Sequence, residues 1–289
     1  DDRADALHLG ATGQQRAPGT LAQLDLAVVG PMARSIGDLE LELDVLAGPD
    51  RWSTDGWTLD LPPARGTTLA DLRIAAWLDD PHLPVDVSTR RLMHETVAAI
   101  EAAGGRVYTE ARPGFTLAKV DEVFKQLMFA ALSGDHSREK IEHMAANTDD
   151  SPAGLVKRAT AMRHRDWLSA NERRLQIREQ WRQFFERYDV ILMPVQPRAA
   201  IAHDHSPRQW DRRVDIDGVE RPYLDLFTWI APAGAGMLPA TVVPVGLGDD
   251  ALPIGIQIVG PYLLDRTTLQ AGRLISRLRG GCPRPALAR

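Results

Sequence analysis

The stretch Leu72-Arg-Ile-Ala-Ala-Trp-Leu78 has the length and apolar character of a short β-strand, and the residues after it predict the fold. Residues 88–103 have the pattern of a helix that ends at Gly104-Gly105, and residues 106–109 again favour a strand. A strand, a helix and a strand at this spacing form a βαβ unit, whose two strands run parallel. The sequence therefore predicts an α/β fold in which 72–78 and 106–109 are parallel neighbours.

Three later runs predict further strands, at 189–194, 240–245 and 254–259. The last two are separated by a turn that contains Gly248-Asp249-Asp250. Their cores are apolar almost without interruption, which is typical of strands covered on both faces. Together with the βαβ unit, these runs predict an α/β/α layer sandwich with a mixed sheet.

Helical patterns surround the predicted strands. Ser35 has the properties of an N-cap for a helix over 35–47, and Asp265 is the expected cap of a last helix over 266–278. Residues 115–187 are predicted to be a helical insert within a single domain that spans 1–289.

The long last helix of the predicted insert, from 166 to about 187, has apolar residues at roughly helical spacing. They are Trp167, Leu168, Leu175, Ile177, Trp181, Phe184 and Phe185. Further on, Asp217-Gly218 signals a two-residue β-hairpin turn, and residues 223–231 are predicted to be helical.

Composition excludes several classes of partner. The chain has 34 Lys and Arg against 39 Asp and Glu, a net charge of −5, which argues against nucleic acid or an anionic membrane as its main partner. No apolar run approaches the roughly 20 residues that span a bilayer. The polar, acidic N-terminus is unlike a signal peptide, and the lone Cys282 excludes an internal disulfide. We therefore expect a cytoplasmic protein.

Two short clusters resemble a metal site and a catalytic triad, but each lacks features that such a site requires. His203 and His205 have the spacing of metal ligands, but too few further ligands lie nearby, so we predict no metal there. Ser133-Gly-Asp-His136 resembles a collapsed catalytic triad, yet triad residues converge in space rather than in sequence, and a loop is the better interpretation. Cys282 lacks an obvious catalytic partner, and no dinucleotide or phosphate-binding motif is present, so we expect no cofactor.

The most glycine-rich stretch is Ala231-Pro-Ala-Gly-Ala-Gly-Met237-Leu-Pro239. Its small residues allow another group to approach the backbone closely. That group is either a ligand or another packed element, and the sequence alone leaves both interpretations open.

Three segments in order resemble the amidase signature family. The first is Val29-Gly-Pro-Met-Ala-Arg-Ser-Ile-Gly-Asp-Leu39, and the second is Tyr188-Asp-Val-Ile-Leu-Met-Pro194 followed by Pro197. The third combines Leu238-Pro-Ala-Thr-Val-Val-Pro-Val-Gly246 with Leu252-Pro-Ile-Gly-Ile-Gln-Ile-Val-Gly-Pro261. Each segment is moderately specific, and the three together extend the resemblance from residue 29 to about 278.

The resemblance implies an enzyme that hydrolyses amide bonds of small molecules through a serine acyl-enzyme, without metal or organic cofactor. It also implies that the helical insert at 115–187 and the loops at 195–215 and 229–238 shape substrate choice. From the last of these we nominate Trp229, Gly234, Gly236 and Met237 as substrate-binding residues. Gln257, between Ile256 and Ile258 in the third segment, points to the opposite face of its strand and is expected to hydrogen-bond a nearby loop.

The catalytic residues of that family have no counterpart here. In the family, the nucleophilic serine, the cis-serine, the lysine base and the oxyanion-hole amides lie upstream of the G-P-M-A-R segment. The 29 residues before Gly30 contain neither serine nor lysine, and the first of each are Ser35 and Lys119. We therefore assign no catalytic residue, expect the triad upstream of Asp1, and expect an incomplete fold that is inactive alone.

Two hypotheses remain for the chain as a whole. The first is the C-terminal portion of an amidase domain. The second is a non-catalytic pseudoenzyme or partner subunit with the same half of the fold. Neither the particular amide nor the oligomeric state follows from the sequence, and a homo-oligomer stays open.

Overall fold

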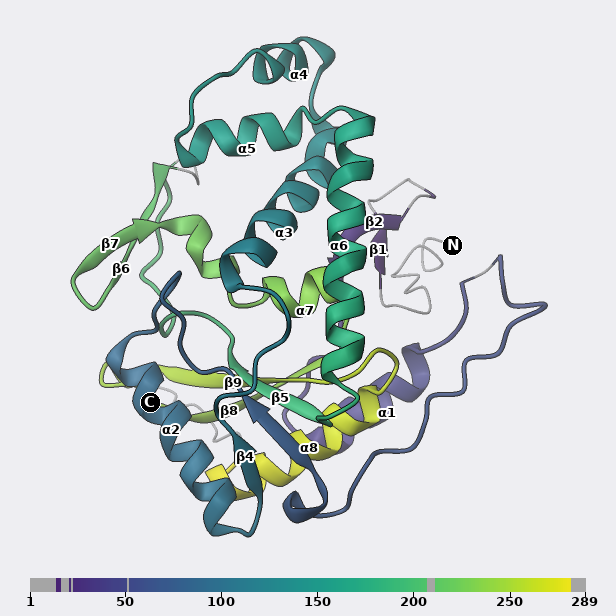
Figure 1. Cartoon of the computed structure of the whole chain (residues 1–289), viewed down its shortest axis with the longest axis vertical. Helices are drawn as coiled ribbons and strands as arrows, with labels where there is room; N and C mark the ends of the chain where they lie inside the picture. The colour runs from purple at the N-terminus through teal and green to yellow at the C-terminus, as the bar shows by residue number, and fades with distance from the viewer. Residues whose placement is uncertain (1–13, 17–20, 22, 51, 207–210, 282–289) are drawn as a thin grey trace, which may run out of the picture.

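The computed structural model describes residues 14–16, 21, 23–50, 52–206 and 211–281. A five-stranded mixed sheet in the order β4-β3-β5-β9-β8 lies across its lower half (Figure 1). The strands are β3 (Arg73–Ala76), β4 (Arg106–Tyr108), β5 (Val190–Pro194), β8 (Ala240–Leu247) and β9 (Pro253–Val259).

The predicted βαβ unit is confirmed. β3 and β4 are parallel neighbours with Arg73 opposite Arg106, and α2 (Val87–Ala102) connects them. The carboxylate of Asp86 caps this helix by accepting a hydrogen bond from the Thr89 amide at 2.7 Å. Because β3 also pairs in parallel with β5, whereas β5–β9 and β9–β8 are antiparallel, the sheet is mixed as predicted.

Helices cover both faces of the sheet, which confirms the α/β/α sandwich. Residues that alternate along β3 and β5 contribute to two separate apolar clusters, as the two-residue period of a strand requires. Ile74 and Leu192 pack with α2 and with α8 (Asp265–Arg279) on one face. Ala75 and Ile191 pack on the other face with α3 (Leu117–Ala131), α6 (His164–Phe184) and α7 (Ala231–Gly236).

The edge strand β8 is covered on one face only, although its apolar run has the pattern of a strand covered on both. Val243 and Val245 are buried against α8 and α2, but Val242 on the opposite face is 50% exposed. β5, which is buried at all five positions, lies at the centre of the sheet, whereas β8 has a strand on one side only. Apolar residues on the outer face of an edge strand mark a surface that another element can cover.

The region 115–187 is helical, as predicted, and consists of α3, α4 (Arg138–Ala145), α5 (Pro152–Thr160) and α6. α4 and α5 lie farthest from the sheet (Figure 1). The apolar stripe predicted for the last helix is wrong at two positions, because Leu168 and Leu175 are exposed while Ala170 and Arg174 occupy buried positions instead. Whether the whole chain is one domain with this region as an insert stays a prediction.

The first helix, α1 (Ile36–Leu46), begins where the sequence predicts. The Ser35 hydroxyl accepts a hydrogen bond from the Asp38 amide at 3.1 Å. Asp265, by contrast, is the first residue of α8 and not its cap, because the non-helical residue before the helix is Leu264.

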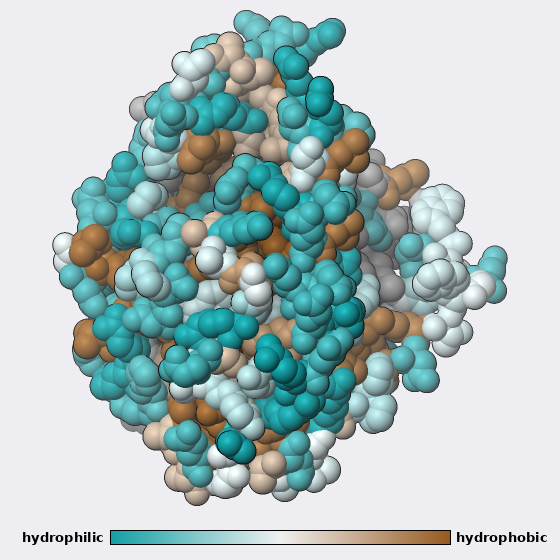
Figure 2. Space-filling model, viewed as in Figure 1, coloured by the Kyte–Doolittle hydropathy of each residue, from teal (hydrophilic) through white to brown (hydrophobic). Residues whose placement is uncertain are grey.

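A small antiparallel ribbon, β1 (Gln14–Arg16) and β2 (Gln23–Val28), precedes α1. The predicted hairpin is also present as β6 (Arg213–Ile216) and β7 (Val219–Pro222). Asp217 and Gly218 both have positive φ, as the tight turns that join antiparallel strands require. On the face shown in Figure 2, apolar side chains appear as small separate groups among hydrophilic ones.

The prediction of one helix over 223–231 is wrong. The stretch forms a 3₁₀ segment at Tyr223–Phe227, which is followed by α7. Aromatic and β-branched side chains disfavour an extended helix here, and Pro232 lies at the start of α7, where its missing amide hydrogen costs nothing.

Gln257 joins the sheet to the segment that follows the 3₁₀ turn. Its side chain is 2% exposed, and its amide Nε2 donates to the carbonyl oxygens of Pro194 and Trp229, each at 2.7 Å. The expectation that it points away from Ile256 and Ile258 and bonds a loop is confirmed. Since both carbonyls are buried next to it, loss of this amide leaves polar atoms without water to replace it.

Replacing Gln257 with leucine tests this bridge. We expect Gln257→Leu to lower the free energy of unfolding by about 2 kcal/mol or more, because two buried carbonyls lose their donor. Urea unfolding followed by far-UV circular dichroism measures the change. The matched control is Gln183→Leu on the exposed side of α6, which should change stability by no more than about 0.5 kcal/mol. Equal effects for both variants would contradict the bridge.

Candidate functional site

The residues nominated from sequence lie on and around α7, where α3 and α6 pack against it. Trp229 is fully buried, its indole Nε1 donates to the Leu83 carbonyl at 3.2 Å, and its ring meets Trp77 edge to face at 6.0 Å. It therefore forms part of the interior, and its main role in this structure is to hold the start of α7 against the strand ends.

The two glycines of α7, Gly234 and Gly236, are in close contact with aromatic side chains of the chain itself. A Cβ on Gly234 would lie 2.6 Å from the Phe124 ring, and one on Gly236 would lie 2.8 Å from the Trp181 ring. Real Cβ atoms do not come this close, so both positions exclude side chains. The close neighbours are thus the chain's own aromatic residues, although Gly236 also lines a pocket.

Met237 ends α7 in a left-handed conformation, with φ of 53° and ψ of 43°. Its amide donates to the Gly234 carbonyl at 3.1 Å, which closes the last turn of the helix. A left-handed residue without a glycine is strained by about 1 kcal/mol, so the surrounding packing must hold it. This turn directs the chain from α7 into Leu238 and the start of β8.

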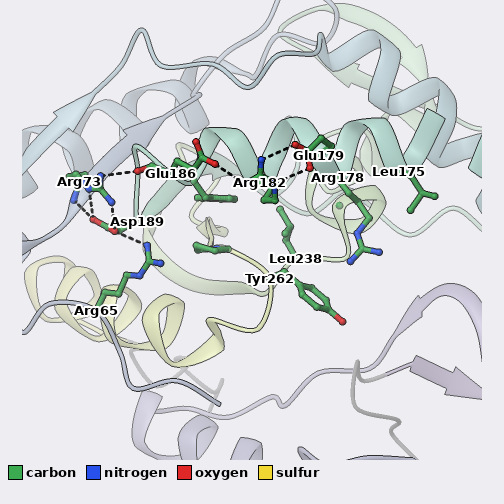
Figure 3. A pocket seen from close by; sticks show the side chains of 13 residues that line it. Arg65, Arg73, Leu175, Arg178, Glu179, Arg182, Glu186, Asp189, Leu238 and Tyr262 are labelled. Carbon is green, nitrogen blue, oxygen red and sulfur yellow. Dashed lines mark hydrogen bonds and ion pairs between the residues drawn. The ribbon is translucent and has the colours of Figure 1, made fainter. Parts of the chain in front are cut away.

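A pocket of about 860 Å³ opens beside the C-terminal half of α6. Its walls come from the start of β5, the end of α7, the segment after β9 and the loop around Arg65 (Figure 3). Four arginines and three carboxylates line it together with apolar residues such as Leu238. The volume is within the range of small-molecule sites, which are mainly apolar with a few charged groups.

Asp189 anchors one end of the pocket. Its carboxylate, 8% exposed, accepts hydrogen bonds from Arg73 Nε at 3.1 Å and Nη2 at 2.9 Å, and from Arg65 Nη1 at 3.0 Å. The Arg73 amide adds a further bond at 2.9 Å. Burial by itself raises the pKa of Asp189, but the hydrogen bonds from Arg73 and Arg65 outweigh it and hold the pKa below its ordinary value.

Arg182 is paired in the middle of the pocket wall. It contacts Glu179 through two nitrogens, each at 2.9 Å, and Glu186 at 2.6 Å. Hydrogen bonds from Arg182 and then Gln183 lower the pKa of Glu179 to about 2. Because one guanidinium faces two carboxylates, this group keeps a net negative charge and offers a ligand no free cation.

Arg178 lies at the other end of the pocket, and Figure 3 shows its guanidinium turned away from the Arg182 pair toward the side where Leu238 and Tyr262 lie. Its guanidinium carbon is 5.1 Å from the centre of the Tyr262 ring, a cation–π contact. Among the described residues, no carboxylate forms an ion pair with Arg178. We call Arg178, Tyr262, Leu238 and Leu175 the Arg178 end of the pocket.

The other candidates from sequence do not form sites in the described part of the chain. No group of three or more His, Cys, Asp or Glu residues suited to a metal ion occurs there. The rings of His203 and His205 meet edge to face, and Asp204 between them accepts a hydrogen bond from the Ser206 amide at 2.8 Å. The absence of metal at this pair stays a prediction.

Ser133 lies in a 3₁₀ segment, Leu132–Asp135, between α3 and α4. The His136 ring contacts Lys140 Nζ at 3.2 Å, so it is engaged within its own turn of chain. Cys282 falls outside the described residues. Within the described ranges, no helix is long and apolar enough to cross a membrane.

Sequence inspection did not find the pocket. The lining residues Arg65, Arg73, Arg178, Asp189 and Tyr262 are separated by up to nearly two hundred positions. Of these, Asp189 lies in the Tyr188–Pro194 segment, which gave no indication of a pocket. The one available signal was Asp189 immediately before an apolar strand, where a buried carboxylate requires cationic partners. The partners themselves could not be identified, because arginines are frequent throughout the chain.

Solved structures that share this fold include proteins described as an aryl acylamidase and an allophanate hydrolase. A bacterial aryl acylamidase of the amidase signature family superposes with a TM-score of 0.71 at 17% identity, over 93% of this chain and 57% of that one. Allophanate hydrolase from Kluyveromyces lactis gives a TM-score of 0.58 at 16% identity, over 86% of this chain and 39% of that one. At these identities the comparison establishes the fold.

The family follows from the sequence comparisons. The chain is 25% identical to an indoleacetamide hydrolase of Bradyrhizobium japonicum over 258 residues, which cover 88% of this chain and 52% of that protein. It thus spans about half the length of the curated relatives it matches. A family model described as Amidase matches residues 15–269. The chain belongs to the amidase signature family.

The pH dependence of stability tests the Asp189 cluster. Because the pKa of Asp189 is depressed, its carboxylate stabilises the fold above the ordinary pKa of about 3.9, and this contribution is lost as pH falls through the folded-state pKa. We expect Asp189→Asn to cost about 2 kcal/mol at pH 7, a figure reduced for the half-exposed arginines.

Urea unfolding between pH 7 and pH 2.5 measures this difference. It should shrink below about pH 4, where Asp189 of the unfolded chain takes up a proton before Asp189 of the folded chain does. Glu179→Gln on the exposed side of the same pocket is the control and should have a much smaller effect at pH 7. A pH-independent cost of Asp189→Asn would show that the effect comes from packing and not from the charge.

Proposed function

We propose that this chain is part of an enzyme that hydrolyses the amide bond of a small molecule. In that reaction the carbonyl carbon loses its bond to nitrogen, gains an oxygen from one water molecule, and leaves as a carboxylate while the amine takes up a proton. The observation that carries the proposal is the match to the Amidase model over 15–269, which is supported by the mixed sheet shared with amidase structures.

The catalytic chemistry has to come from residues outside the matched motifs. We propose that the serine acyl-enzyme forms on a portion of the amidase domain equivalent to the half of the relatives that this chain does not span. We propose further that no metal or organic cofactor takes part. In this proposal the described residues supply the sheet, the helices that cover it and the pocket wall.

The substrate class follows from the named relatives and from α7. Relatives named indoleacetamide hydrolase and aryl acylamidase make amides with an aromatic ring the first candidates. We propose that Gly236 and Met237 face the substrate from the end of α7, next to the pocket. In this proposal Trp229 and Gly234 do not contact the substrate. They hold α7 in place through their contacts with Leu83 and Phe124.

The segment from 21 to 57 has the surface expected where the remaining amidase portion docks. It contributes eight of the 19 large apolar side chains that are exposed among the described residues. Leu41 and Val45 on α1 are 64% and 77% exposed, and no residue of that helix is buried. Ion pairs of α1 with Arg266 and Arg273 attach one side of the helix to α8 and leave the apolar side uncovered.

The exposed apolar side of α1 predicts how the chain behaves alone. We expect the purified chain to self-associate and to bind a dye that reports apolar surface, since contiguous apolar groups favour association. Sedimentation velocity and dye fluorescence measure both. Leu41→Gln with Val45→Gln should lower dye binding, whereas Val87→Gln with Val219→Gln, at similarly exposed positions elsewhere, should not. A monodisperse monomer without dye binding would favour the self-sufficient, non-catalytic alternative.

Activity is tested by completing the domain. The chain alone should neither hydrolyse phenylacetamide nor react with a serine-directed fluorophosphonate, because it has no residue in the family's triad positions. A chimaera that adds the upstream portion of an amidase signature enzyme should do both. The control is the same chimaera with its nucleophilic serine changed to alanine.

Two outcomes would contradict the proposal. Stoichiometric labelling of the chain alone, at Ser133 or any other serine, would reveal a different active site. A chimaera that is soluble and labels with the fluorophosphonate, but hydrolyses no amide, would show that this chain does not complete an amidase. The pseudoenzyme or partner-subunit hypothesis would then be favoured.

A further inference from the structure

The Arg178 end of the pocket combines a positive charge with apolar and aromatic groups. Three of the four pocket arginines already contact carboxylates: Arg65 and Arg73 share Asp189, and Arg182 is held by Glu179 and Glu186. Arg178 differs from them, because its partner in the described part of the chain is the Tyr262 ring and not a carboxylate. Arg178 is therefore the pocket guanidinium whose N–H donors are not taken up by a carboxylate of the described residues.

The groups around Arg178 define the chemistry of a matching ligand. A guanidinium presents paired N–H donors in one plane, which suit the two oxygens of a carboxylate. Tyr262 is 44% exposed and offers a ring face or edge to a second aromatic ring, while Leu238 and Leu175 provide apolar walls. A ligand with a flat apolar body and one terminal carboxylate satisfies all of these groups at once.

We propose that the Arg178 end binds the carboxylate of an aromatic acid, with Arg178 pairing with the anion and Tyr262 and Leu238 contacting the ring. This proposal rests on the proposed function, because hydrolysis of the amide of an aromatic acid releases an anion of this class. Neither the family match nor the names of the relatives assign Arg178 or Tyr262 to a site. The pocket would then hold the acid product.

A segment of protein is the competing occupant. The pocket lies beside α6 residues such as Leu175 that are exposed, and an acidic side chain from the remaining amidase portion would also satisfy Arg178. The volume of about 860 Å³ and the aromatic wall favour a small ligand. The experiment distinguishes the two, because a docked segment would exclude the small molecule.

Binding is measured on the full chain by ¹H–¹⁵N NMR titration with three probes: phenylacetate, its neutral isostere phenylacetamide, and acetate. We expect phenylacetate to saturate below about 5 mM and to shift the Tyr262 backbone amide and the Arg178 Nε–H signals. Phenylacetamide, which lacks the charge, and acetate, which lacks the ring, should each bind about 10-fold more weakly.

Arg178→Gln should weaken phenylacetate binding by about 10-fold or more while leaving the affinity for phenylacetamide unchanged. The matched control is Arg165→Gln, an exposed arginine on the same helix outside the pocket, whose loss should leave phenylacetate affinity within about 2-fold. Tyr262→Leu, as a second variant, should weaken phenylacetate and phenylacetamide alike. Unchanged circular dichroism spectra establish that each variant is folded.

Several results would overturn the inference. They are a failure of phenylacetate to saturate, equal affinity for acetate, or equal weakening by Arg165→Gln. In the amidase chimaera, loss of phenylacetate binding at this site would show that a protein segment occupies the pocket. Hydrolysis by the same chimaera is scored separately, so the proposed function can stand when this binding site fails.

Discussion

One buried amide connects the central strand of the sheet to the segment that leads into α7. Gln257 donates to the carbonyl of Pro194, at the end of the central strand, and to that of Trp229, just before α7. Those two carbonyls belong to segments 35 residues apart, so the amide sets the distance between the sheet and the helix. α7 can then carry glycines against Phe124 and Trp181, because its position is held from the sheet side.

The central strand β5 is restrained at both ends by polar contacts, although its interior is wholly apolar. At its start, Asp189 joins Arg73 of the neighbouring strand and Arg65 of a distant loop. At its end, Pro194 receives the Gln257 amide. Apolar burial provides most of the driving force for folding, but it is not directional, whereas these bonds specify register and position. The pocket begins where the first set of bonds lies.

The exposed surfaces belong to the parts of the fold that lack a neighbour. The outer face of β8 and the apolar side of α1 both contain aliphatic residues open to solvent, whereas β5 and the core side of α6 are covered. Exposed apolar surface of this kind marks where another element or chain can pack. The chain spans about half the length of the curated relatives it matches, and these are the surfaces at which we propose that the remaining amidase portion docks.

The sequence by itself determined the architecture. The spacing of apolar residues, together with cap and turn residues, predicted the βαβ unit at 72–109, the capped helix after Ser35 and the Asp217-Gly218 hairpin. It also predicted the orientation of Gln257. Each of these features depends on residues that are neighbours along the chain. Three ordered motifs indicated the family for the same reason. Only the tertiary structure decided what the glycines of α7 contact, which face of β8 stays open, and that Arg65, Arg73, Arg178 and Tyr262 line one pocket. These features depend on which distant segments meet. Contacts between distant segments are set by the packing of the whole chain, and they leave no periodic pattern in the sequence.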